Sequence, residues 1–174
     1  MRTTTVFFDL ETGGLRDGLD GRAEHPNIQV SAVAVKPGLA PTLPWEEVAW
    51  FDARIKFDPA ACDPEALTMN GYDAARWAAE AVPEAQAMRS FDGFLDQHSD
   101  LRLTSKAGRP YNVARIGGHN VSSFDIPRLR RAMDRAGVRF MRACWWYPVD
   151  TYSAAIWHYY AMDGYATPPQ NYQL

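Results

Sequence analysis

Residues 6–14 read Val-Phe-Phe-Asp-Leu-Glu-Thr-Gly-Gly, and this stretch decides the fold. Residues 3–8 are β-branched or aromatic, which favours a buried strand, and the two glycines end it. Asp9 and Glu11 lie two residues apart at the strand's end, so their side chains share a face. Because convergent carboxylates repel each other without a cation between them, the stretch predicts a site for Mg²⁺ or Mn²⁺. The alternative is an exposed strand end with solvated acids.

A third carboxylate, Asp125, follows a predicted short strand over residues 113–118. It precedes a predicted helix over residues 126–136, which Gly137 closes. An aspartate in this position either caps the helix or reaches a metal ion. Both readings stay open on the sequence alone.

The remaining elements follow from hydrophobic periodicity and from turn residues. We expect a meander of three strands, a helix start at Asp63 and Pro64, two longer helices, an exposed basic loop and a fifth strand. In chain order the later strands span 28–35 and 45–57, the helix 84–98, the loop 101–112, the fifth strand 139–147, and the last helix begins at 151. Together they predict an α/β domain with a mixed five-stranded sheet flanked by helices.

Two clusters of side chains have competing interpretations. Arginines at positions 128, 130, 131, 135, 139 and 142 are opposed only by Asp134, so they either bind phosphates or form a solvated helix face. The run Trp145, Trp146 and Tyr147 either stacks on bases or belongs to the core. In the third strand, Val48, Trp50 and Ala53 are the expected inward residues.

The bulk composition is that of one globular domain. The chain has 174 residues, 22% of them charged, a net charge of −3 and two cysteines. This length suits a single domain over residues 1–174, and two distant cysteines suggest reduced thiols in a cytoplasmic protein. We find no leader and no apolar run long enough for a membrane span.

Two motifs carry a family resemblance. The stretch FFDLETGGL resembles the first motif of the DEDD, or DnaQ-like, exonuclease superfamily, which includes proofreading exonucleases, exonuclease I, ribonuclease T and oligoribonuclease. Residues 118–133, GHNVSSFDIPRLRRAM, are similar to its second motif, centred on Asp125. Residues 64–72 resemble the segment that connects them. The resemblance covers most of residues 3–160 and implies a ribonuclease H-like fold.

The resemblance also implies an activity. It implies that Asp9, Glu11 and Asp125 hold two metal ions, Mg²⁺ or Mn²⁺, in a 3′→5′ exonuclease that releases nucleoside 5′-monophosphates. Thr12, Gly13 and Gly14 are expected to contact the terminal nucleotide. His119 and Asn120 are expected either to hold the backbone of their loop or to contact the nucleotide. Single-stranded DNA, or a 3′ end, is the expected partner. The alternatives are an RNA-trimming enzyme similar to ribonuclease T or oligoribonuclease, and a catalytically incomplete relative that binds nucleic acid.

The family requires a fourth carboxylate, preceded by a histidine five residues earlier or a tyrosine four residues earlier. Asp163 has both spacings, to His158 and to Tyr159. Five residues along a helix turn the side chains about 140° apart, so His158 and Asp163 would not face one metal. We therefore expect the third motif to lie beyond Leu174, after a helix that Asn171 begins.

Overall fold

The structure is a computed structural model, and it describes residues 2–18, 22–40 and 43–163. The first three strands form the predicted meander. Strand β1 (Thr5–Thr12) pairs antiparallel with β2 (Asn27–Lys36), and β2 pairs antiparallel with β3 (Glu46–Arg54). β1 extends four residues beyond the predicted strand, so Asp9 and Glu11 lie inside the sheet rather than at the end of the strand.

The other side of the sheet is built on β5 (Pro110–Gly118). β5 runs parallel to β1 and to β6 (Cys144–Asp150), and it pairs antiparallel with β4 (Leu101–Thr104). The described sheet therefore has six strands, in the order β3-β2-β1-β5-β4 with β6 also on β5. This confirms the predicted mixed α/β sheet and adds one strand to it.

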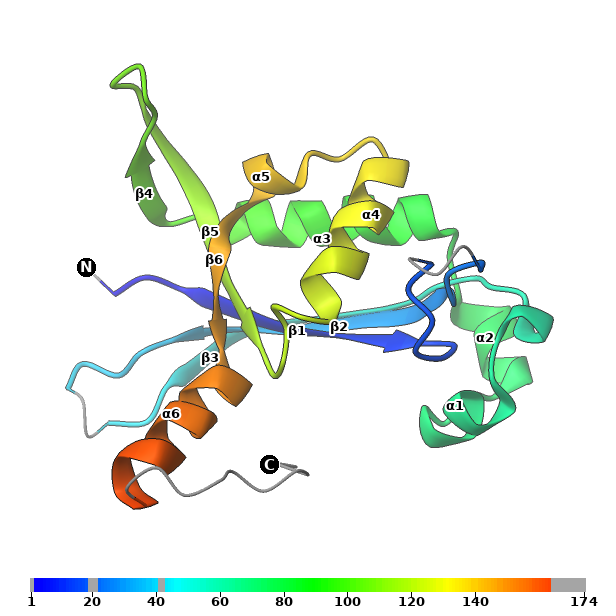
Figure 1. Ribbon diagram of the computed structural model, residues 1–174. Coiled ribbons are helices and arrows are strands. Elements are labelled where there is room, and N and C mark those ends of the chain that lie inside the picture. Colours follow the sequence, from blue (N-terminus) through cyan, green and yellow to red (C-terminus); the bar gives the residue numbers. More distant parts are fainter. Residues whose placement is uncertain (1, 19–21, 41–42, 164–174) are drawn as a thin grey trace.

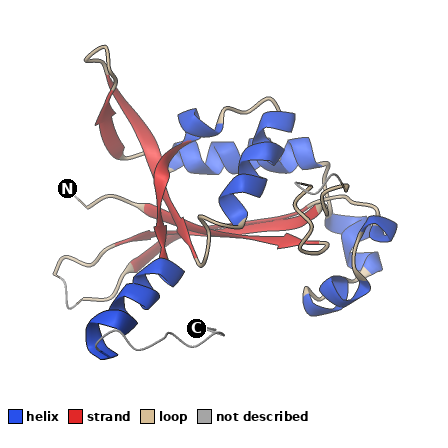
Figure 2. Cartoon of the chain, viewed as in Figure 1, coloured by secondary structure: helices blue, strands red, loops and turns tan. Residues whose placement is uncertain are grey.

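Helices cover both sides of the sheet (Figures 1 and 2). On one side lie α3 (Glu84–Gln97), α4 (Asp125–Arg135) and the short α5 (Phe140–Ala143), while α6 (Thr151–Asp163) lies on the other. The shorter elements η1 (Pro59–Ala61), α1 (Pro64–Met69) and α2 (Ala74–Glu80) follow β3. None of the described helices is long and apolar enough to span a membrane.

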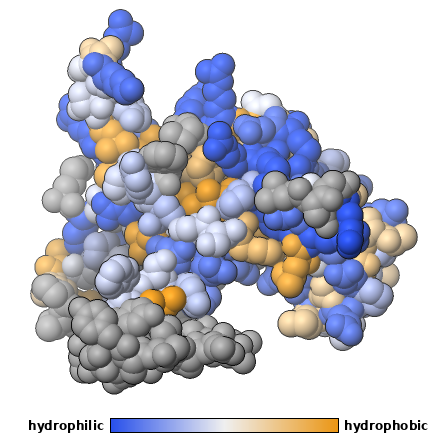
Figure 3. All heavy atoms as spheres, in the orientation of Figure 1, coloured by the Kyte–Doolittle hydropathy of each residue, from blue (hydrophilic) through white to orange (hydrophobic). Residues whose placement is uncertain are grey.

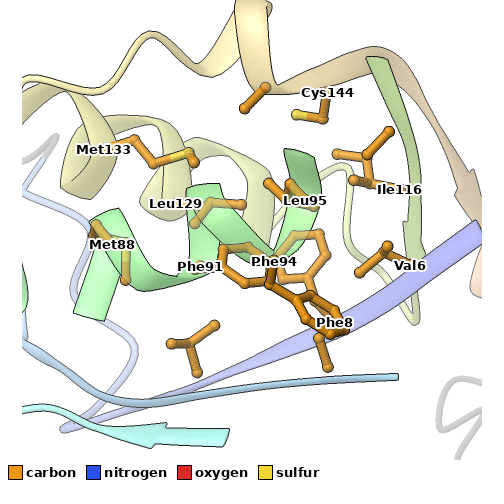
Figure 4. Packing of buried hydrophobic residues seen from close by; sticks show 14 of the residues in the cluster. Val6, Phe8, Met88, Phe91, Phe94, Leu95, Ile116, Leu129, Met133 and Cys144 are labelled. Carbon is orange, nitrogen blue, oxygen red and sulfur yellow. The ribbon is translucent and has the colours of Figure 1, made fainter. Parts of the chain in front are cut away.

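The main core lies between the sheet and α3–α4. Phe8 of β1 packs against Phe91 of α3 with ring centroids 5.9 Å apart, and Leu129 of α4 closes the same cluster (Figure 4). Alternation along β1 places Val6, Phe8 and Leu10 in this core. The opposite face of β1 therefore carries Phe7, Asp9 and Glu11.

Three sequence predictions need correction. Residues 101–112 are not a loop, because β4 and the start of β5 pair there as a hairpin. In the segment 139–147 the strand begins only at Cys144, after the helical turn α5. In β3 the inward side chains are Ala49, Phe51 and Ala53, so the predicted Ala53 is correct, whereas Val48 and Trp50 are exposed.

The last predictions about the third motif fall partly outside the described residues. Helix α6 begins at Thr151 as expected and ends at Asp163. The side chains of Tyr159 and Asp163 and all of residues 164–174 lie outside the described part. The position of a fourth carboxylate therefore stays a prediction.

Candidate active site

Two of the three candidate carboxylates come from the middle of β1. Asp9 lies opposite Ser31 of β2, and Glu11 lies opposite Gln29, so the carboxylates share a polar strip of the sheet face. Asp9 is exposed and Glu11 is half-buried. Period two along the strand explains why both point away from the apolar core.

The third carboxylate reaches the same strand from the first residue of α4. Asp125 is buried, with 3% of its surface exposed, and its Oδ1 accepts the Leu10 N–H at 3.0 Å. A carboxylate at a helix N-terminus is favoured by the helix dipole. The hydrogen bond fixes Asp125 beside the residue that lies between Asp9 and Glu11.

The three acids influence one another's ionisation. Burial, and after it the negative charge of Asp9, raise the pKa of Asp125 to about 7, although the hydrogen bond from the Leu10 N–H acts in the opposite direction. Burial and the charge of Asp9 also raise the pKa of Glu11, and protonated Glu11 donates a hydrogen bond to Asp9. Asp9 is therefore the common neighbour of the other two carboxylates.

The donor set fits a hard divalent cation in its chemistry. Carboxylate oxygens are the ligands that Mg²⁺ and Mn²⁺ prefer, and a cation among these acids would favour their ionised forms. The geometry is less complete: among the described residues, no three His, Cys, Asp or Glu side chains form a group that could hold a metal ion.

A cavity of about 710 Å³ lies beside Glu11, between the end of β1 and α1. This volume lies within the range of pockets that bind small ligands. Apolar side chains dominate its wall, with a few polar groups among them. It is lined by Leu10, Glu11, Thr12, Gly14, Leu15, Asp63, Pro64, Glu65, Ala66, Met69, Asn70 and Phe124. Of the predicted nucleotide-contacting residues, the cavity includes Thr12 and Gly14.

The Thr-Gly-Gly sequence packs the end of β1 closely against the next segments. The Thr12 hydroxyl donates to the Gly14 carbonyl at 2.9 Å, and the Gly13 N–H donates to the Pro26 carbonyl at 2.8 Å. A Cβ at Gly13 would clash with the sulfur of Cys62. These groups are thus engaged within the chain, and their predicted contact with a nucleotide stays a prediction.

Arg128 is a residue that sequence reasoning placed on the surface. Its side chain is 1% exposed and donates to the carbonyl oxygens of Arg16 (2.8 Å), His25 (3.2 Å) and Gly14 (3.4 Å). The guanidinium also lies 4.6 Å from the ring centroid of Phe124, which lines the cavity. Arg128 therefore holds Gly14, Arg16 and His25 against α4. Its position three residues after Asp125, on the same helix face, is the sequence signal that could have found it.

Two other arginines of α4 are occupied by ion pairs. Arg131 contacts Glu24 at 2.5 Å, and Arg135 contacts Glu84 at 2.8 Å and Glu24 at 3.4 Å. These pairs explain why a basic stretch occurs in a chain of negative net charge. They also leave Arg131 and Arg135 poorly available for phosphates.

His119 and Asn120 lie in the turn between β5 and α4, outside the cavity lining. His119 Nδ1 lies 3.2 Å from Thr151 Oγ1, and its ring packs edge-on against Tyr152. Asn120 has a φ of 54° and donates its N–H to Asp150 at 3.1 Å. The turn is thus tied to the start of α6.

Asp150 is the centre of this junction and was missed from the sequence. It also accepts the N–H groups of Ser122 at 3.0 Å and Tyr152 at 3.1 Å. Burial opposes ionisation, but the hydrogen bonds from Ser122, Ser153 and Tyr152 outweigh it and lower the pKa of Asp150. Its place just before a predicted helix was the available sign of a capping residue.

Comparisons with known proteins agree with this fold. No protein-family model matches the chain, and no curated protein matches it. The chain is similar to solved structures of exonuclease I, including the apo form (TM-score 0.68, 15% identity) and the E. coli enzyme in complex with a dT13 oligonucleotide (TM-score 0.64, 16% identity). The zinc-bound form of the E. coli ExoI–ssDNA complex also matches (TM-score 0.64, 16% identity).

These alignments cover 99%, 98% and 98% of this chain but only 34%, 32% and 32% of those structures. The chain therefore spans about a third of the length of the exonuclease I chains. At such low identity the match establishes the fold, which is the one that the two motifs predicted. The chain has the ribonuclease H-like fold of the DnaQ-like exonucleases.

Proposed function

We propose that this protein is a metal-dependent nuclease that removes nucleoside 5′-monophosphates from the 3′ end of single-stranded DNA. The observation that carries the proposal is the placement of Asp9 and Glu11 on one face of β1, with Asp125 hydrogen-bonded to Leu10 between them, beside a cavity that Glu11 lines. The fold shared with exonuclease I supports it, as does the oligonucleotide bound in one of those structures.

The carboxylates and the cavity wall would have different roles in this reaction. Asp9, Glu11 and Asp125 would hold Mg²⁺ or Mn²⁺, with Asp9 as the shared ligand because its charge acts on both of the other carboxylates. Two such ions, when bound, activate a water and stabilise the leaving 3′-oxygen. The apolar wall formed by Leu10, Leu15 and Phe124 would receive the terminal base and sugar.

The first test is metal binding by calorimetry with Mn²⁺. We expect Asp9→Asn to weaken Mn²⁺ binding at least tenfold, because it removes the carboxylate whose charge acts on both Glu11 and Asp125. The matched control is Asp52→Asn on the same sheet face, where the carboxylate is occupied by Ser31 and by Arg54 at 3.3 Å. Equal Mn²⁺ affinity of wild type and Asp9→Asn would refute the assignment.

The second test is hydrolysis of 5′-labelled DNA and RNA oligonucleotides with Mn²⁺. We expect a ladder of products shortened from the 3′ end, lost at least about 10²-fold in Asp9→Asn. Faster cleavage of the RNA would favour the trimming ribonuclease instead.

A non-catalytic relative is the second candidate. The observation that favours it is that the described residues do not form a ready-made metal group. Such a protein would bind the oligonucleotide with a measurable Kd and leave it intact at saturating Mn²⁺. Binding without cleavage would therefore select this candidate.

A further inference from the structure

The hairpin formed by β4 and the start of β5 is an exposed basic part of the described structure. Residues 101–116 contain Arg102, Lys106, Arg109 and Arg115 and no acidic residue, although acids outnumber Lys and Arg by 21 to 18 in the whole chain. The hairpin projects away from the body of the protein (Figure 1), and hydrophilic side chains cover its tip (Figure 3).

The charges on this hairpin are free, in contrast to those of Arg128, Arg131 and Arg135 on α4. Arg102, Lys106 and Arg109 are exposed, and in the described part of the chain their side chains make no ion pair or hydrogen bond. Exposed cations without partners retain their full attraction for an anion. The turn itself is well formed, since the Arg109 N–H donates to Ser105 Oγ at 3.0 Å.

A hollow of about 560 Å³ lies along the base of the hairpin, lined by Arg102, Tyr111 and Asn112 among others. Asp100 also lines it, but its carboxylate already accepts the Thr4 N–H at 2.9 Å and the Thr4 hydroxyl at 2.6 Å. Tyr111 is 43% exposed. A cation, an amide and an exposed aromatic ring together suit a phosphate and a stacked base.

The hairpin shares a sheet face with the candidate active site. A Cβ at Gly117 would lie 2.8 Å from the Phe7 ring, so Gly117 of β5 is on the face that carries Phe7 and Asp9. By period two, Tyr111 and Arg115 are on the same face. The eight residue steps from Pro110 to Gly118 span roughly 26 Å, or about eight nucleotides at the stacked rise of a strand.

We propose that the β4–β5 hairpin is a second nucleic-acid contact, which binds the phosphates of the strand several nucleotides away from the 3′ end held at the carboxylates. The inference rests on the proposed function, since it takes the substrate to be nucleic acid. It assigns Arg102, Lys106 and Arg109 to phosphates and Tyr111 to a base. The alternative role of these charges is to keep the exposed strand β4 from pairing with other chains.

The test measures binding of fluorescent DNA at several salt concentrations in an Asp9→Asn background, which prevents cleavage. The hairpin variant is Arg102→Ala/Lys106→Ala/Arg109→Ala. For an oligonucleotide of about 20 residues we expect at least tenfold weaker binding and a salt slope reduced by about 2, since each phosphate contact contributes about 0.7 for single strands. For an oligonucleotide of about four residues, too short to reach the hairpin, we expect unchanged affinity.

Two controls keep the outcome interpretable. Arg89→Ala/Arg130→Ala/Arg142→Ala removes the same charge from exposed positions on α3, α4 and α5, and we expect it to leave the slope unchanged. Arg102→Lys/Arg109→Lys retains the charge and should retain binding, which excludes a misfolded hairpin. Equal losses in both alanine variants, or no loss in either, would overturn the proposal. Loss of Mn²⁺ binding or cleavage in Asp9→Asn alone tests the proposed function separately, since the three hairpin substitutions made in the wild-type chain should leave Mn²⁺ binding and cleavage of the short substrate intact.

Discussion

At the scale of single residues, Asp125 makes stability depend on pH in the direction opposite to most aspartates. Its pKa is raised from 3.8 to about 7 in the folded protein, first by burial and then by Asp9. The folded state therefore binds this proton more tightly than the unfolded state. The stability that protonation provides is complete below pH 3.8 and is lost as pH rises through 7.

We predict that Asp125→Asn stabilises the metal-free protein at pH 8 by on the order of 3 kcal/mol and has little effect near pH 4. The amide cannot ionise, and its oxygen still accepts the Leu10 N–H. Urea unfolding with a chelator present measures the difference at each pH. A gain of the same size at both pH values would mean that packing, not ionisation, is responsible. Saturating Mn²⁺ should reverse the ranking at pH 8, since only the wild type keeps all three ligands.

Gly13 shows a different constraint at the same scale. We predict that Gly13→Ala destabilises the fold by about 1–3 kcal/mol, because the new methyl group would overlap the Cys62 side chain. Thermal or urea unfolding measures this loss. Cys62→Gly removes the obstructing atoms, so the double variant should lose less stability than the two single losses added together. If the stability losses of Gly13→Ala and Cys62→Gly add strictly in the double variant, the predicted overlap between residue 13 and Cys62 is contradicted.

At the scale of elements, α4 supplies both the buried carboxylate and the buried guanidinium of the site. The described residues between Gly14 and His25 belong to no strand, and the carbonyl oxygens of Gly14, Arg16 and His25 accept hydrogen bonds from Arg128. A buried carbonyl oxygen without a hydrogen bond destabilises the folded state, so we expect the loop and α4 to be stable only together.

We therefore predict that Arg128→Lys costs about 2–3 kcal/mol, because an ammonium group cannot reproduce the planar fork that reaches three carbonyls. Chemical denaturation gives the value. Arg130→Lys, at an exposed position on the same helix, is the matched control and should be neutral. If Arg128→Lys and Arg130→Lys change the free energy of unfolding equally, the contacts of Arg128 with the carbonyl oxygens do not contribute to stability.

The sequence predicted most elements but not all of them, for identifiable reasons. The meander, α3, α4 and α6 were predictable because their apolar residues alternate or recur over long stretches. The hairpin at 101–112 was not, because β4 buries little and its charges and turn residues resemble an exposed loop. The ion pairs of α4 were hidden as well, since Glu24 lies more than a hundred residues before Arg131.

At the scale of the whole molecule, the site is formed where three separate segments converge, residues 9–15, 63–70 and 124–125. Asp9 and Glu11 were predictable as a pair because a strand repeats every two residues, and Asp125 because a short motif surrounds it. The cavity wall was not predictable in detail. Asn70, for example, contributes by donating to the Thr12 carbonyl at 2.8 Å, a contact that depends on how α1 packs against β1.

Because α4 holds β1 through Asp125 and the loop through Arg128, opening of this helix should release both at once. The Leu10 N–H bonds to Asp125, and the His25 N–H bonds to Arg16, whose carbonyl Arg128 also holds. In native-state hydrogen exchange these two amides should therefore exchange with the same opening free energy, and Arg128→Lys should accelerate both equally. The two walls of the cavity would then form a single cooperative unit, so that local opening near the site is all-or-none.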